Sequence, residues 1–217
     1  MTRPLLLLSL AALVLTAWPL LPAWGSEIAP LEGRLTLIAT SAPPPWEPSK
    51  RAEDPAERFE RLNTIARAIA LESKTPPAGW RWGSAELAAV LLRVTYEEGW
   101  RWRRDVHDGR QLGDNGKARC LAQLHRHPTW MPKNLWLAST GTDLESTRTC
   151  VAGAARVLAH YSAECVSDYS AKHDLEGSFA RLLVGYGTGT GCNPKGRAWA
   201  TERARAAVKW LAELRKP

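Results

Sequence analysis

Two adjacent glutamates, Glu97 and Glu98, close an apolar run of this sequence in the stretch VTYEEGW. A carboxyl group beside an apolar wall loses solvation, and its pKa rises. Such a group can hold a proton near neutral pH and deliver it to a glycosidic oxygen. The pair therefore indicates acid chemistry on a glycosidic bond, and the alternative is ordinary surface charge at a helix end.

An amphipathic helix over residues 83–99 is expected to position both acids. Ser84 is its expected N-cap, and Gly99 its expected left-handed terminal residue. Apolar residues recur at three- and four-residue spacing, which predicts a buried face: Leu87, Val90, Leu91 and Val94. Continuing this stripe by three or four positions reaches Glu97 and Glu98 alike, so periodicity does not distinguish them.

Most of the remaining chain also carries helical patterns. Helices are predicted over 54–73, 143–165 and 196–214, and a shorter one ending in glycines within 174–192. Residues 101–119 are polar and contain the turn signals HDG and GDNG, so loops or a small β-ribbon are expected there. The prediction is a mainly α-helical domain over residues 53–217 with one irregular insertion.

The N-terminus has the pattern of an export signal. Arg3 precedes an apolar run, Leu5 to Trp18, and Ala23 to Gly25 form a small-residue cleavage site. We interpret residues 1–25 as a signal peptide, with an uncleaved anchor as the alternative. Residues 26–52 contain SAPPPWEPSK and are expected to form an extended linker or N-terminal arm.

Charge and cysteine content agree with export. The chain has a net charge of +7, and signal cleavage would remove only the positive charge of Arg3. A basic exported protein favours anionic envelope polymers as partners rather than nucleic acid. The four cysteines, Cys120, Cys150, Cys165 and Cys192, predict two disulfides in any of three pairings. Their spacing does not match a zinc site, and neither a metal nor a cofactor is expected.

Four motifs in order resemble one enzyme family. They are EEGW, DVHDGRQLGDNGKARCLAQLH, CVAGAARVLAHY and VGYGTGTG, and the resemblance that they carry covers about residues 84–192. Together they resemble the lysozyme-like lytic transglycosylases, including the relatives of goose-type lysozyme. The resemblance implies a lysozyme-like helical domain in which a small β or loop insertion lines the cleft.

The resemblance assigns roles to individual residues. Glu97 matches the catalytic glutamate, and Glu98 stands where the family has serine. Trp100 falls at an aromatic position and Gln123 at the cleft-lining glutamine, so both are expected to bind substrate. Tyr186 matches a substrate-binding tyrosine that lies close to the catalytic acid.

The chain departs from the family pattern at two further positions. Cys120 replaces a glycine, and Gly187 replaces an asparagine. On the implied fold, a disulfide between Cys120 and Cys150 would pin the Gln123 segment. The second disulfide would then join Cys165 to Cys192.

The implied function is cleavage of the glycosidic bond between N-acetylmuramic acid and N-acetylglucosamine in peptidoglycan. One glutamate suffices for a transglycosylase, which forms 1,6-anhydro products, whereas a hydrolytic lysozyme uses a second carboxylate. Glu98 and Asp114 are the candidates for that second group. A non-catalytic peptidoglycan-binding module is the further alternative. We expect a monomer in the periplasm or outside the cell, without a membrane anchor once the signal is cleaved.

Overall fold

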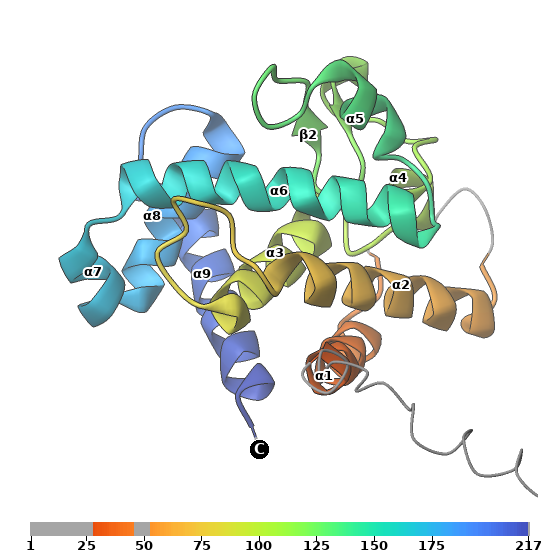
Figure 1. Cartoon of the computed structure of the whole chain (residues 1–217), viewed down its shortest axis with the longest axis horizontal. Helices are drawn as coiled ribbons and strands as arrows, with labels where there is room; N and C mark the ends of the chain where they lie inside the picture. Colours follow the sequence, from red (N-terminus) through yellow and green to blue (C-terminus); the bar gives the residue numbers. More distant parts are fainter. Residues whose placement is uncertain (1–27, 46–52, 217) are drawn as a thin grey trace, which may run out of the picture.

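The computed structural model describes residues 28–45 and 53–216. Within these ranges the chain is mainly helical, as predicted, with one small antiparallel sheet (Figure 1). The long helices are α1 (Ile28–Ser41), α2 (Pro55–Ser73), α3 (Ser84–Glu98), α6 (Leu144–Cys165), α8 (Leu175–Thr188) and α9 (Ala198–Leu214). The shorter elements are α4 (Arg104–His107), the 3-10 turn η2 (Asp114–Gly116), β1 (Ala118–Arg119), β2 (Leu124–His125), α5 (Lys133–Ala138) and α7 (Asp168–His173). The proposed signal peptide, residues 1–25, lies outside the described residues.

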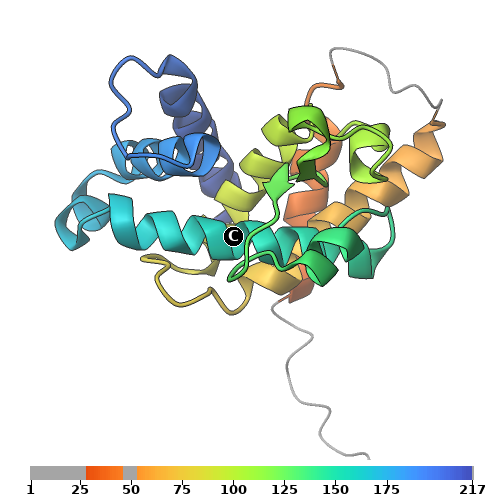
Figure 2. The same ribbon diagram turned by 90° about the horizontal axis from the view of Figure 1, so that it is seen from above.

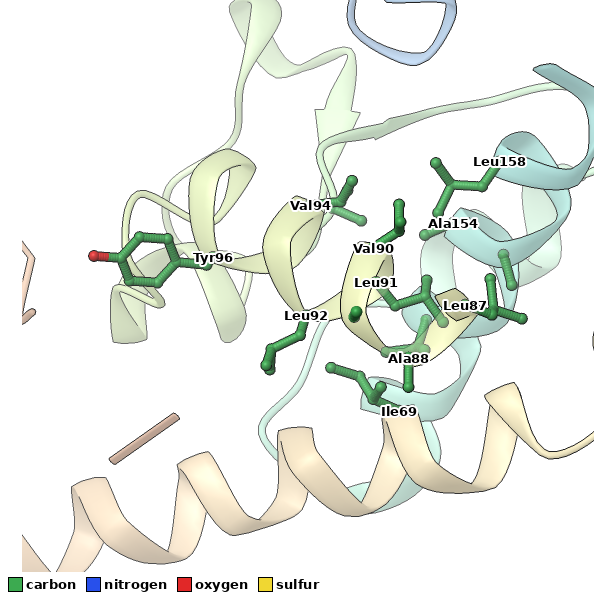
Figure 3. Packing of buried hydrophobic residues seen from close by; sticks show 14 of the residues in the cluster. Ile69, Leu87, Ala88, Val90, Leu91, Leu92, Val94, Tyr96, Ala154 and Leu158 are labelled. Atoms are coloured by element: carbon green, nitrogen blue, oxygen red, sulfur yellow. The ribbon is translucent and has the colours of Figure 1, made fainter. Parts of the chain in front are cut away.

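Helix α3 is central to the core. It packs against α2, α6 and α9, and its predicted apolar stripe is fully or almost fully buried (Figures 1 and 3). Val90 of α3 and Leu158 of α6 are both among the side chains of this core. Burial of such a stripe contributes about 1.5–3 kcal/mol for each large apolar side chain. The end of α3 that carries the two glutamates is therefore held from several sides.

Local sequence signals set most helix ends. The Asp54 carboxylate accepts a hydrogen bond from the backbone N–H of Glu57 at 2.8 Å, and α2 begins at the following proline. At α3 the predicted cap is wrong, because Gly83 rather than Ser84 is the N-cap. The hydroxyl of Ser84 instead donates to the carbonyl of Lys74 at 3.2 Å, across the turn from α2.

The expected extended arm over residues 26–52 is wrong for its first part, which forms α1. Leu35 and Ala39 are fully buried, and α1 packs against α2. Leu31, Leu35 and Ile38 recur at helical spacing and give α1 an apolar face. The prolines at 43–45 follow the end of the helix instead of preventing it, and residues 46–52 lie outside the described residues.

The insertion between α3 and α5, defined here as residues 99–125, is compact and irregular. β1 pairs with β2 in antiparallel register, Ala118 opposite His125. His107 at the end of α4 is fully buried and lies 2.9 Å from the hydroxyl of Thr147 on α6. Burial lowers the pKa of His107 to about 3, so its ring is neutral near pH 7. This neutral contact attaches the insertion to α6.

Two disulfides, Cys120–Cys150 and Cys165–Cys192, connect both ends of α6 to other segments. These are the two pairs that the family resemblance implies. Disulfides of this kind are typical of proteins in oxidising compartments. None of the helices in residues 28–45 and 53–216 is both long and apolar enough to cross a membrane.

Candidate functional site

Backbone strain is concentrated between the glutamates and Gln123. All non-glycine residues with positive φ in the described ranges lie in this part of the chain: Trp100, Arg101, Trp102, Asp114, Asn115, Cys120 and Gln123. A left-handed conformation costs roughly 1–2 kcal/mol for an ordinary residue, and such strain clusters at functional sites. The insertion is therefore the strongest candidate for a functional site by its backbone conformation.

Helix α3 does not end as predicted. Gly99 has φ of −79°, and the left-handed turn is formed by the next three residues, Trp100, Arg101 and Trp102. Trp102 is fully buried, and its indole N–H donates to the Thr95 hydroxyl at 3.2 Å. Its ring also packs edge-on against Tyr96, with centroids 4.9 Å apart. This burial offsets the strain of the turn.

Gly99 is required for close packing rather than for its backbone conformation. A Cβ atom there would lie 2.4 Å from the Thr95 carbonyl oxygen and 2.9 Å from Cδ2 of Leu121. The end of α3 therefore lies directly against the turn formed by residues 120–123. This contact brings the glutamates next to the segment that carries Gln123.

Substituting Gly99 with alanine should destabilise the protein by about 1–3 kcal/mol, since the added methyl group overpacks this contact. Gly33 provides a matched control, because it lies in exposed helix with nothing within 4 Å of a new Cβ. Gly33→Ala should stabilise by roughly 0.5–1 kcal/mol. Urea unfolding measures both changes, and a neutral Gly99→Ala would contradict the close approach.

Both glutamates are paired with arginines. Glu97 forms an ion pair with Arg93, one turn earlier in α3, and its side chain is 14% exposed. Glu98 pairs with Arg203 of α9 at 2.5 Å and is 23% exposed. Burial lowers the pKa of Arg93 from its usual range, an effect that the Glu97 charge opposes. Glu98 is therefore not ordinary surface charge at a helix end, because its ion pair links α3 to α9.

Tyr186 of α8 connects Glu98 to the insertion. Its hydroxyl donates to the carbonyl oxygen of Ala122 at 2.6 Å. Burial raises the pKa of Tyr186 well above its usual range, and the charge of Glu98 raises it further while Arg203 lowers it. Tyr186 therefore lies within electrostatic reach of Glu98. Of the two glutamates, Glu98, which the resemblance places at a serine position, is the one whose charge acts on Tyr186.

Two residues of α9 contact the two positions, 98 and 187, at which the resemblance places a serine and an asparagine. Arg203 pairs with Glu98, which stands in place of serine. Trp199, one turn earlier, lies 2.8 Å from a Cβ built on Gly187, so a side chain such as asparagine does not fit there. The Arg203 guanidinium lies over the Trp199 ring at 4.8 Å. The two positions are thus parts of one packed cluster.

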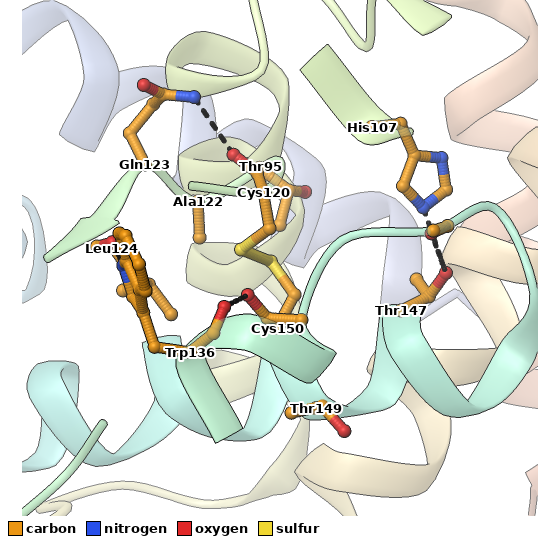
Figure 4. Close-up of a disulfide and its surroundings, with 12 residues drawn as sticks. Thr95, His107, Cys120, Ala122, Gln123, Leu124, Trp136, Thr147, Thr149 and Cys150 are labelled. Carbon is orange, nitrogen blue, oxygen red and sulfur yellow. Dashed lines mark hydrogen bonds between the residues drawn. A yellow bond between two sulfur atoms is a disulfide. The ribbon is translucent and has the colours of Figure 1, made fainter. Parts of the chain in front are cut away.

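The turn that carries Gln123 is fixed by a disulfide and by its own side chain. Cys120 is bonded to Cys150 of α6, and the Gln123 side-chain amide donates to the Cys120 carbonyl at 3.0 Å (Figure 4). The Gln123 side-chain oxygen lies so close to Gly113 that a Cβ there would clash. Gln123 is therefore held in one orientation before any ligand binds.

A pocket of about 670 Å³ opens beside this turn. Its lining comes from the insertion with β2, from the segment that follows β2, from α6 and from the C-terminal end of α8. The backbone of these elements is drawn from above in Figure 2. The lining residues are Asp114, Gln123, Leu124, His125, Arg126, His127, Trp130, Val157, His160, Tyr161, Tyr186, Gly187, Thr188 and Gly189. This volume is within the usual range for ligand pockets, roughly 300–1,000 Å³.

The pocket brings together only some of the predicted site residues. Gln123, Tyr186 and Asp114 line it, whereas Glu97, Glu98 and Trp100 do not. Asp114 is engaged by His125 at 2.6 Å. Trp100 is 39% exposed, and its ring stacks against the Arg103 guanidinium outside the pocket. The Glu98 cluster nevertheless adjoins the pocket, because Trp199 packs against Gly187, which lines the pocket.

Sequence reasoning missed Trp199 and Arg203. The sequence does show that they are four residues apart, and this spacing places both on one face of α9. That this face meets Gly187 and Glu98 depends on how α9 packs against α3 and α8.

Comparison with known protein families, curated proteins and solved structures finds no match to this chain. Function is therefore inferred from the residues and their geometry.

Proposed function

We propose that the protein is an exported enzyme that cleaves peptidoglycan between N-acetylmuramic acid and N-acetylglucosamine, as a lytic transglycosylase. One observation carries the proposal. The glutamate-bearing end of α3 is joined to α9 by the Glu98–Arg203 ion pair, and Trp199 on the same face of α9 packs against Gly187, which lines the pocket. Left-handed backbone directly follows the two glutamates. Strain and paired carboxylates beside a pocket are typical of catalytic sites.

In the proposed mechanism Glu97 serves first as acid and then as base. Its carboxyl proton passes to the leaving glycosidic oxygen as the bond from C1 to that oxygen breaks. The acetamido group of the muramic acid can assist. The Glu97 carboxylate then accepts the proton of the C6 hydroxyl, whose oxygen bonds to C1 and closes the 1,6-anhydro ring. This route needs neither a metal nor a cofactor.

Glu98 is assigned a positioning role. Its ion pair with Arg203 joins α3 to α9, and both charges act on Tyr186 of α8, so removing Glu98 would loosen the junction between α3 and α9. The partner of Glu97, Arg93, belongs to the same helix. Glu97 can therefore separate from Arg93 and take up a proton without moving one helix away from another. This freedom is what a group that gains and loses a proton during the reaction needs.

Two observations favour other functions. Neither glutamate lines the pocket, and both are ion-paired, which favours a non-catalytic peptidoglycan-binding module. Asp114 lies at the pocket as a possible second carboxylate, which favours a hydrolytic lysozyme. Its carboxylate is engaged by His125 and its side chain is 67% exposed, so nothing in the structure holds it in a fixed position for activating a water molecule, and this alternative ranks lower.

The test is digestion of purified peptidoglycan sacculi by the chain from residue 26 onward, with mass spectrometry of the soluble products. Anhydro-muropeptides are expected. Products with reducing ends would identify a lysozyme instead. Binding to sacculi without soluble products would identify the non-catalytic module.

A further inference from the structure

The pocket carries donors and positive charge that the cleavage mechanism does not use. Its lining includes Arg126 and three histidines, His125, His127 and His160. Asp114 is the one carboxylate among the described residues that line it, and it already contacts His125. The side chains that can donate hydrogen bonds or carry positive charge thus outnumber the carboxylates that could pair with them, so the pocket suits an anionic ligand.

His127 is fixed as a hydrogen-bond donor. The backbone N–H of Thr129 donates to its Nδ1 at 3.2 Å, so the neutral ring carries its proton on Nε2. The ring lies face to face with Trp130, with centroids 3.4 Å apart and planes 2° from parallel. Both contacts orient the ring before a ligand binds.

Arg126 supplies the positive charge. It is exposed at the pocket and has no ion-pair partner among residues 28–45 and 53–216. His160, by contrast, lies 3.2 Å from Glu164. A guanidinium can hold a carboxylate through two parallel hydrogen bonds, which a histidine cannot. Arg126 and His127 are therefore the donors left for a ligand.

The remaining walls suit a sugar. Trp130, which packs against His127 and His160, and Tyr161 add aromatic surface to the lining, and Gln123 and Tyr186 add oriented polar groups. We infer that this pocket is a subsite for a carboxylate-bearing sugar unit, whose carboxylate is held by Arg126 and His127. The identity of the glycan as peptidoglycan rests on the proposed function. In that glycan the carboxylate belongs to the lactyl group of N-acetylmuramic acid or to its peptide stem.

Calorimetric binding to the Glu97→Gln protein tests the subsite without turnover. Three ligands are compared: a neutral N-acetylglucosamine oligomer, an alternating oligomer with N-acetylmuramic acid, and the same oligomer with peptide stems. Both anionic oligomers should bind at least tenfold more tightly than the neutral one, as expected for a charge-assisted hydrogen bond. If only the stem-bearing oligomer does so, the stem supplies the carboxylate. Equal binding of all three ligands overturns the inference.

Matched variants separate the subsite from general charge attraction. Arg126→Gln removes the charge, and His127→Phe removes the donor while keeping a ring against Trp130. Each should lose most of the preference for anionic oligomers and leave binding of the neutral oligomer unchanged. Lys117→Gln, an exposed basic residue outside the pocket lining, should change neither. Equal weakening of neutral and anionic oligomers would count against the subsite.

Failure of the subsite is distinguishable from failure of the proposed function. Anionic preference without cleavage by the wild-type protein leaves the subsite in place and removes the enzymatic proposal. Cleavage by the wild-type protein without a preference for anionic oligomers supports the enzymatic proposal and removes the subsite.

Discussion

Glu97→Gln should lower the rate of peptidoglycan cleavage by about 10²–10⁴-fold, the usual contribution of a general acid or base. The amide keeps the size of the side chain and removes its proton transfer. The measurement is the rate of anhydro-muropeptide release from sacculi, followed with wild type and variant at equal concentration.

The neighbouring acid gives the decisive comparison. Glu98→Gln should cost roughly tenfold and act partly through KM, because it loosens the Arg203 contact but leaves the reacting group in place. Glu86→Gln is the matched control, since Glu86 is also a paired and largely buried carboxylate of α3, contacting Arg215 far from the pocket. It should change the rate little. If Glu98→Gln abolishes cleavage and Glu97→Gln does not, the acid is the residue that adjoins Tyr186.

The two disulfides should contribute similarly to stability and differently to activity. Their sequence separations are 30 and 27 residues, so the loop-entropy relation gives about 3–4 kcal/mol for each. Replacing either pair by alanines should therefore lower the unfolding free energy by a similar amount in chemical denaturation.

Only loss of Cys120–Cys150 should impair cleavage beyond its effect on stability. This disulfide fixes the turn that contains Gln123, and the Ala122 carbonyl of the same turn accepts the hydrogen bond from the Tyr186 hydroxyl. Neither Cys165 nor Cys192 lines the pocket. We expect at least a tenfold fall in rate for the first variant at a temperature where both variants are folded. Equal rates in the two variants would show that the disulfide does not position the turn.

Much of the helical framework was predictable because its signals are local. The stripe on α3, the Asp54 cap of α2 and the Asp143 cap of α6 each depend on residues a few positions apart. The short helix α7 was not predicted. The arm over residues 26–52 was mistaken because its prolines were given more weight than the apolar spacing of Leu31, Leu35 and Ile38, which α1 buries against α2.

The candidate site was predictable only as a set of residues. The sequence, through its resemblance, named Gln123 and Tyr186, which do line one pocket. It did not indicate that Trp100 lies outside the pocket lining and packs against Arg103, because the position of Trp100 depends on the left-handed turn after Gly99. Such a turn in non-glycine residues is stable only when tertiary burial, here of Trp102, offsets its cost.

By itself, the sequence determined the helical class, most helix boundaries and the position of two acids at the end of a buried stripe. These follow from periodicity and capping, which act within a few residues. The tertiary structure alone decided what each acid contacts. Arg203 is 105 residues from Glu98, and Tyr186 is 64 residues from the carbonyl that holds it. Partners so distant in the chain are chosen by the packing of α3, α8 and α9, for which no local pattern exists.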